Sequence, residues 1–359
     1  MKKSYLTLAA VAVIMASCSE TNEVKNGANE AAQEAAISFD QFTESVTKAA
    51  ITSESDLKTP GFGVFGYKTN DGFSTSQTIF NNVKVYSESA SGTADDAIVW
   101  KYDNLRFWDK TATYNFYAIA PFEAATANYN ISNDPKTGMF TIDNVASAIS
   151  SSSKDYLIDR DGNKGVSGNY SGTHAKVPFE FHHTMAKVDF KLKSTLSSGT
   201  IEVTSVKMTG WNSGAGKFVQ TLTATPTTLE HSEWTIATAG TGDITLVGTG
   251  ATQTTVALTC ATDATPTTVT DWYIMVPQTV AANGLTFTVD YIYKDGDYTE
   301  TFKNQVAKIS ATQIWGTDSH TTYTLDIKPA AIEFDVTSVC NFCVDGNATD
   351  NNDANGTVN

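Results

Sequence analysis

Apolar and polar residues alternate along most of this sequence from residue 37 onward. Runs in which every second residue is apolar recur at 62–67, 113–120, 177–181, 186–192 and 287–293. A period of two places alternate side chains on opposite faces of a β-strand, so these runs predict half-buried strands. An Asp-Gly pair separates the last run from the next β-rich segment and predicts a hairpin turn.

The apolar residues change parity between two neighbouring runs in the middle of the chain. They fall on odd positions from Val177 to Phe181 and on even positions from Ala186 to Leu192. Because one face of a sheet keeps one parity, this change predicts a bulge or a corner between His182 and Met185.

Many short strands separated by turns predict an all-β protein built from β-sandwiches. The chain is too long for one sandwich of ordinary size, and a glycine-rich loop at 161–168 precedes the second series of strands. We therefore predict two sandwiches in tandem, over residues 37–174 and 175–335. An Asn- and Asp-rich extension, residues 336–359, is expected to be disordered.

The N-terminus has the pattern of an export signal. A short basic start precedes an uncharged apolar run at 5–16, which is shorter than the roughly 20 residues that span a bilayer. Small residues then lead to Cys18, as in a bacterial lipobox, where the thiol receives a diacylglycerol and the new amine a third acyl chain. We predict a signal peptide over 1–17, a lipid anchor at Cys18 and a flexible acidic tether over 18–36. The alternative is an ordinary signal peptide followed by a chance cysteine.

Composition and charge agree with an exported β-rich protein and limit its partners. The formal net charge is −15, from 24 basic and 39 acidic residues, and only 18% of the residues are charged. Such a surface repels the phosphates of nucleic acids and anionic lipid head groups, so neither is an expected partner.

No motif predicts an enzyme, a cofactor or a metal centre. Gly61–Gly66 matches Gly-x-Gly-x-x-Gly but lacks the following helix whose N-terminus would bind a pyrophosphate. His182 and His183 are adjacent and would point to opposite faces of a strand. Residues 159–170 lack the glycine and glutamate of an EF-hand, although a looser calcium turn there is left open. We expect no catalytic residue, no cofactor and no metal.

Cys340 and Cys343 form a Cys-x-x-Cys pair close to the C-terminus. A redox-active pair would need a helix N-terminus to lower the thiol pKa, and an acidic, Asn-rich segment follows instead. In an oxidising compartment we expect a disulfide between the two, or reaction with another chain. Cys260 is then left over and is expected to be buried.

A strand is predicted close to each end of the fold. Ile332, Phe334 and Val336 are the apolar positions of a clean alternation at 331–337, and Ile37–Phe39 is a shorter first strand. Such strands would suit exchange between subunits, in which one chain receives the edge strand of a neighbour. The alternative is two ordinary edge strands of a monomer.

Short motifs spread over residues 18–336 share the order and spacing of one known family. They are the lipobox at Cys18, Ile37–Phe39 with Val46–Ala49, Phe62–Tyr67, Tyr114–Pro121, Asp155–Leu157, Phe181–Val188 and Trp272–Gln278. In these motifs the chain resembles the fimbrillin-like family, the subunits of the type V pili of gut and oral anaerobes.

The resemblance implies two transthyretin-like Greek-key β-sandwiches and export to the outer membrane as a lipoprotein. It implies that a trypsin-like protease removes the N-terminal segment, and that a C-terminal strand of the next subunit enters the groove so opened. Lys48 stands where relatives commonly carry arginine, so the cut would fall between Lys48 and Ala49. Ile332, Phe334 and Val336 would be the donated side chains.

We therefore expect a structural or adhesive subunit of a surface fimbria, with other subunits and a host surface ligand as partners. The alternative is a lipid-anchored surface protein that binds a glycan or host ligand through exposed aromatic residues such as Trp211 and Trp234. A secreted enzyme on a β-sandwich is the third hypothesis, and the absence of a catalytic motif argues against it.

Overall fold

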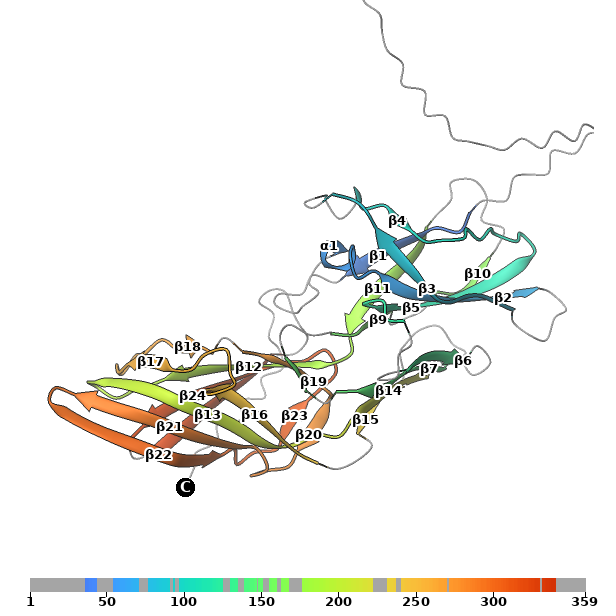
Figure 1. The fold of residues 1–359 in the computed structure, drawn as a ribbon. Coiled ribbons are helices and arrows are strands. Elements are labelled where there is room, and N and C mark those ends of the chain that lie inside the picture. The colour runs from blue at the N-terminus through green and yellow to red at the C-terminus, as the bar shows by residue number, and fades with distance from the viewer. Residues whose placement is uncertain are drawn as a thin grey trace, which may run out of the picture. The chain divides into compact units, whose positions relative to one another are not determined.

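The chain's computed structural model describes most of the residues that follow the predicted tether. The described residues are 36–43, 54–70, 77–90, 93, 97–124, 130–134, 139–146, 148–150, 155–159, 163–167, 176–221, 231–236, 240–269, 271–329 and 331–339. All of them lie in Ala35–Asn359, the larger of the two units into which contacts divide the chain. Apart from one short helix, α1 (Glu54–Leu57), their regular structure consists of β-strands, which confirms the all-β prediction (Figure 1).

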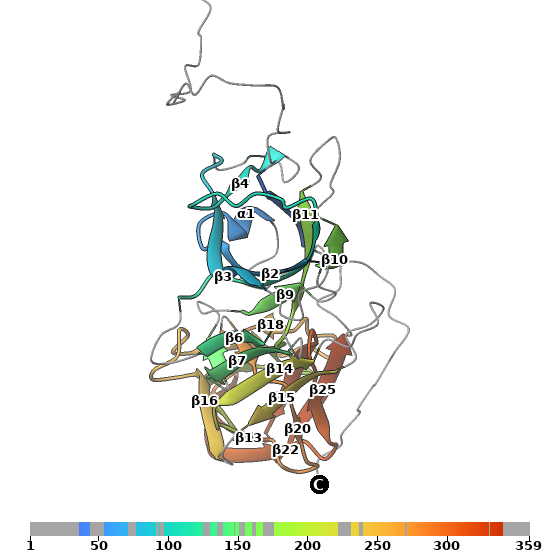
Figure 2. The ribbon, with the colours of Figure 1, turned by 90° about the vertical axis from the view of Figure 1, so that its right-hand side faces the viewer.

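The first sheet has eight strands and contains the N-terminal strand. Its order is β1 (Phe39–Thr43), β11 (Val177–His183), β9 (Leu157–Asp159), β5 (Ala112–Ala120), β2 (Phe62–Asn70), β3 (Gln77–Ser87) and β4 (Trp100–Lys101), and β10 (Asn163–Ser167) pairs with β5. The sheet curls around a core, with β3 and β11 on opposite sides of it (Figure 2). This curvature brings β1 and β4, the two ends of the order, into contact.

Two further sheets face each other around a second core and contain the C-terminal strand. The six-stranded sheet has the order β25 (Ala331–Val339), β24 (His320–Lys328), β12 (Ala186–Lys193), β19 (Tyr273–Met275) and β8 (Ala148–Ser150), and β18 (Thr267–Thr268) pairs with β12. The five-stranded sheet has the order β16 (Thr241–Val247), β13 (Thr200–Asn212), β21 (Thr286–Asp295) and β22 (Tyr298–Lys308), and β17 (Val256–Thr259) pairs with β13.

The remaining strands form two smaller sheets. The four-stranded sheet has the order β15 (His231–Ile236), β14 (Gly216–Thr221), β7 (Met139–Val145) and β6 (Asn130–Asp134), and the last pairs β20 (Gln278–Val280) with β23 (Gln313–Trp315). Phe65 and Tyr117, on the outer side of the first sheet, share a buried cluster with Ile142, Phe218 and Ile274. The described part of the chain contains no helix that is long and apolar enough to cross a membrane.

The predicted turn and corner are both confirmed. Asp295 pairs with Tyr298 across a two-residue hairpin turn in which Gly296 has φ +59°, a conformation that glycine adopts without strain. The parity change falls between β11 and β12, and these strands belong to different sheets. Each strand can therefore keep its own inward-facing parity, which removes the conflict that a single continuous strand would have.

The strand pairing does not follow the predicted domain boundaries. β11 lies after residue 174 and yet pairs with β1 and β9 of the first sheet, whereas β7 and β8 lie before residue 174 and pair with β14 and β19. The second boundary is also too early, because β25 continues to Val339. Glycine-rich loops mark turns in the sequence, and which sheet a strand joins is decided by distant partners. The division into two tandem domains stays a prediction.

A buried ion pair lies at the corner between the sheets. His183 Nδ1 is 2.5 Å from Asp155 Oδ2, and both side chains are almost fully buried. Burial by itself lowers the pKa of His183, but the charge of Asp155 and its hydrogen bond raise the pKa above the ordinary value; Asp318 adds to the increase and Lys187 opposes it. The imidazolium is therefore stabilised by folding.

This pair predicts that stability falls as the pH rises. Because the pKa of His183 is higher in the folded chain, its contribution is complete below the unfolded pKa and is lost as the pH passes through the folded pKa. Urea unfolding between pH 5.5 and 8.5 measures the decline. Asp155→Asn should cost about 3 kcal/mol at pH 6 and flatten the profile, because it leaves a buried charge unpaired. An unchanged profile in Asp155→Asn would show that the pair does not control this pH dependence.

Candidate functional site: the two terminal strands

The N-terminal segment is bonded along one side and, at its start, along the other side as well. On one side β1 runs parallel to β11 with Phe39 opposite Val177, and Val177 N donates to Ser38 O over 2.8 Å. On the other side Ala36 forms a β-bridge with Phe107, and Ile37 N donates to Arg106 O over 2.8 Å. The segment therefore fills a gap between β11 and the loop at 102–107.

The side chains of this segment fill an aromatic groove. Ile37 is 1% exposed and Phe39 is 2% exposed. The ring of Phe39 has four aromatic neighbours with centroids 5.3 to 5.9 Å away, which come from β3, β5, β11 and the loop after β4. These neighbours are Phe80, Phe116, Phe179 and Tyr102. We call the space taken by residues 36–43 between β11 and the 102–107 loop the β1 seat.

Tyr102 and Arg106 form the wall of the β1 seat opposite β11. Tyr102 Oη donates a hydrogen bond to Ile37 O over 2.8 Å, and burial raises the pKa of this phenol, which keeps it a neutral donor. The guanidinium of Arg106 lies 5.0 Å from the centroid of Phe80, and its Nε donates to Ile79 O over 3.0 Å. The wall is thereby attached to β3, independently of β1.

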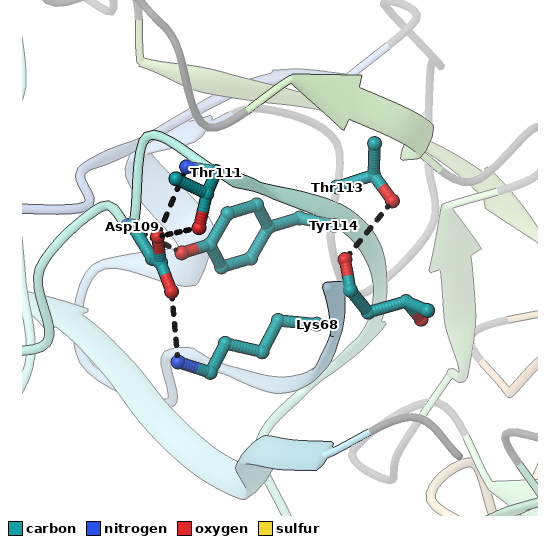
Figure 3. Close-up of polar contacts among 6 residues, drawn as sticks. Lys68, Asp109, Thr111, Thr113 and Tyr114 are labelled. Atoms are coloured by element: carbon teal, nitrogen blue, oxygen red, sulfur yellow. Dashed lines mark hydrogen bonds and ion pairs between the residues drawn. The ribbon is translucent and has the colours of Figure 1, made fainter. Parts of the chain in front are cut away.

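Asp109 fixes the turn that leads from this wall into β5. Its carboxylate accepts hydrogen bonds from the backbone N and the hydroxyl of Thr111 and lies 3.4 Å from Lys68 Nζ on β2 (Figure 3). Asp109 N donates to Tyr114 Oη over 2.6 Å. The Tyr114 ring packs edge-on against Trp108 at 4.8 Å, so the turn closes the aromatic core below the groove.

The C-terminal strand is buried in its own chain. β25 pairs antiparallel with β24 from Lys328 opposite Ala331 to His320 opposite Val339. The predicted donor side chains Ile332, Phe334 and Val336 all face the second core, as the alternation indicated. β25 ends the strand order of its sheet, so in the described part of the chain it has a paired strand on one side only. Its donation to another subunit stays a prediction.

Several predicted site residues lie outside the described residues. These are the lipid anchor Cys18, the cleavage pair Lys48 and Ala49, and the cysteines Cys340 and Cys343. Cys260 is described and is buried, as expected.

The two tryptophans suggested as exposed ligand contacts do not have that role in the structure. Trp211 is only 6% exposed, and its ring covers Gly242 so closely that a side chain there would collide with it. Trp234 is half-buried, packs on Phe218 and donates from Nε1 to Thr184 O over 2.6 Å. The expectation of exposure was wrong because each ring is covered by strands distant in sequence.

His182, His183 and His320 each lie beside a carboxylate. His183 lies beside Asp155, and His320 Nε2 is 2.9 Å from Asp189 Oδ2. Within the described residues no group of three or more His, Cys, Asp and Glu side chains could hold a metal ion. Sequence reasoning missed Tyr102 and Arg106, because no alternation or motif marks their loop.

Comparisons with known proteins identify the class of protein. The family model for fimbrillin-like proteins matches residues 47–340, which is most of the sequence, and the chain belongs to that family. The family is one of fimbrial structural proteins of the cell surface. No curated protein matches the sequence.

Three solved structures are among those similar to this chain. A fimbrial protein from Bacteroides vulgatus has a TM-score of 0.61 at 20% identity, over 85% of this chain and 99% of that one. A candidate cell adhesion protein from Bacteroides uniformis has a TM-score of 0.44 at 15% identity, over 86% and 99%. A tip fimbrial protein from Porphyromonas gingivalis has a TM-score of 0.33 at 10% identity, over 80% and 96%. The first likeness supports the β-sandwich fold.

The β1 seat predicts a large effect of truncating Phe39. Phe39→Ala in the full-length chain should lower the free energy of unfolding by about 3–5 kcal/mol, because it leaves a cavity among four rings. Leu105→Ala, at a side chain that is exposed in the neighbouring loop, is the control and should change it by less than about 0.5 kcal/mol. Urea unfolding followed by tryptophan fluorescence measures both. Equal effects of the two substitutions would contradict the burial of Phe39.

Proposed function

We propose that this chain is a fimbrial subunit that polymerises by strand exchange, with β25 of one subunit replacing β1 of the next. The observation that carries the proposal is the β1 seat, where a short segment bonded on both sides covers an aromatic groove. The family match supports it, since residues 47–340 contain β25 and leave β1 outside. A segment that is removed from the mature subunit would lie outside the part of the chain that the family model matches, as β1 does.

Removal of β1 would leave the seat without a strand. Losing Ile37 and Phe39 takes away two buried side chains whose burial contributes about 1.5–3 kcal/mol each, and it leaves backbone groups of β11 unpaired. A donated strand would restore the ladder with β11 and, at its start, the bonds to the 102–107 loop.

The proposal includes the export pathway. The chain is exported as a lipoprotein with its acyl chains on Cys18, and a trypsin-like protease on the outer membrane cuts between Lys48 and Ala49. The cut lies after β1, so it would release that strand from the rest of the chain. A disulfide between Cys340 and Cys343 would immediately follow the donated strand.

N-terminal sequencing and the oligomer pattern of surface extracts test this proposal. Mature protein should begin at Ala49, and unheated extracts should run as a ladder of oligomers that collapses to a monomer on boiling. Lys48→Ala should keep residues 19–48 and abolish the ladder, because β1 remains in its seat. A ladder that persists in Lys48→Ala would contradict cleavage as the trigger.

Two further variants test donation and anchoring. Deleting residues 331–359 should abolish the ladder, because the donated strand is missing, and polymers that still form would overturn strand exchange. Cys18→Ala should prevent anchoring of the precursor at the outer membrane and reduce surface protein by more than tenfold. Normal surface fibres in Cys18→Ala would contradict the lipoprotein pathway.

The alternative of a glycan-binding surface protein is not retained. Its two aromatic candidates, Trp211 and Trp234, pack against the chain's own residues.

A further inference from the structure

We propose that β25 enters the β1 seat parallel to β11 and in one register, with Ile332 in the site of Ile37 and Phe334 in the site of Phe39. The inference rests on the strand exchange proposed above and adds the direction and register of the donated strand.

The two terminal strands share a four-residue pattern. The first strand region reads Ile37-Ser38-Phe39-Asp40, and the last strand reads Ile332-Glu333-Phe334-Asp335. Ile-x-Phe-Asp occurs at these two places and nowhere else in the 359 residues. The pattern is therefore shared by the strand that fills the seat and the strand proposed to replace it.

The shared Ile and Phe side chains have the same structural role in both places. Ile37 and Phe39 are 1% and 2% exposed, and Ile332 and Phe334 are 6% and 7% exposed. The nearest aromatic neighbour of each Phe is a second Phe at 5.3 Å between ring centroids, Phe80 for Phe39 and Phe287 for Phe334. In both places the Ile and Phe of this pattern therefore fill a pocket that contains an aromatic ring.

The order of Ile and Phe in the shared pattern favours one direction of the strand. Along β11 the Ile37 site precedes the Phe39 site, and Phe39 is opposite Val177. Only a strand parallel to β11 places Ile332 before Phe334 in these sites. An antiparallel strand with Phe334 in the same pocket would bring Val336 to the Ile37 site instead.

Disulfide trapping between subunits tests the register. In β1, Phe42 is opposite Glu180, and the parallel register puts Thr337 there. Adjacent strands lie about 5 Å apart, within the Cα separation that a disulfide spans. The variant Glu180→Cys/Thr337→Cys, in full-length chains that also carry Cys340→Ser and Cys343→Ser, should give a ladder that survives boiling and is lost on reduction.

The matched control places the second cysteine where the antiparallel strand would need it. In that orientation Ala331 is opposite Glu180, so Glu180→Cys/Ala331→Cys should show only the heat-labile ladder. A boiling-resistant ladder in this control would overturn the register and leave strand exchange standing. The same conclusion would follow if unheated samples of both variants showed oligomers and neither variant gave a boiling-resistant ladder. Absence of oligomers in the unheated Cys340→Ser/Cys343→Ser parent would overturn strand exchange and the register together.

A second pair repeats the test closer to the start of the strand. Asp40 is opposite Pro178, so the parallel register puts Asp335 there and the antiparallel one puts Glu333 there. Pro178→Cys/Asp335→Cys should trap the boiling-resistant ladder, and Pro178→Cys/Glu333→Cys should not. The opposite result would overturn the parallel register even if the first pair failed to assemble.

Discussion

The packing of Phe39 among four aromatic rings is the interaction on which the first sheet depends. Its neighbours come from β3, β5, β11 and the loop after β4, so this one side chain joins both ends of a curved sheet. An eight-stranded sheet that curls so far needs a strand to close the gap between β11 and the 102–107 loop, because the backbone groups there would otherwise lack partners. The segment at 36–43 meets this need with few residues.

The Ile-x-Phe-Asp pattern occurs in two different situations. β1 closes the gap between β11 and the 102–107 loop, and β25 lies at the edge of a sheet with one side unpaired. In the strand exchange proposed above, the seat would be open to a donated strand only after β1 had been removed.

The remaining structure holds the seat in shape. Asp109 ties the turn before β5 to β2, and Arg106 ties the wall to β3. The buried pair of His183 and Asp155 fixes the corner where β11 ends, which positions the strand that a new partner would meet. The pair of His183 and Asp155 is buried, whereas the contacts of Asp109 and Arg106 are partly exposed.

The sequence by itself determined the strands with clear alternation, the hairpin at Gly296, the corner after β11 and the inward face of β25, because each follows from alternation or turn chemistry within a few residues. The tertiary structure alone decided which sheet β7, β8 and β11 join, that Trp211 is covered, and that Tyr102 and Arg106 form the wall of the seat. These outcomes depend on pairing between segments far apart in the chain. Such pairing is selected by packing and hydrogen bonds that no local pattern records.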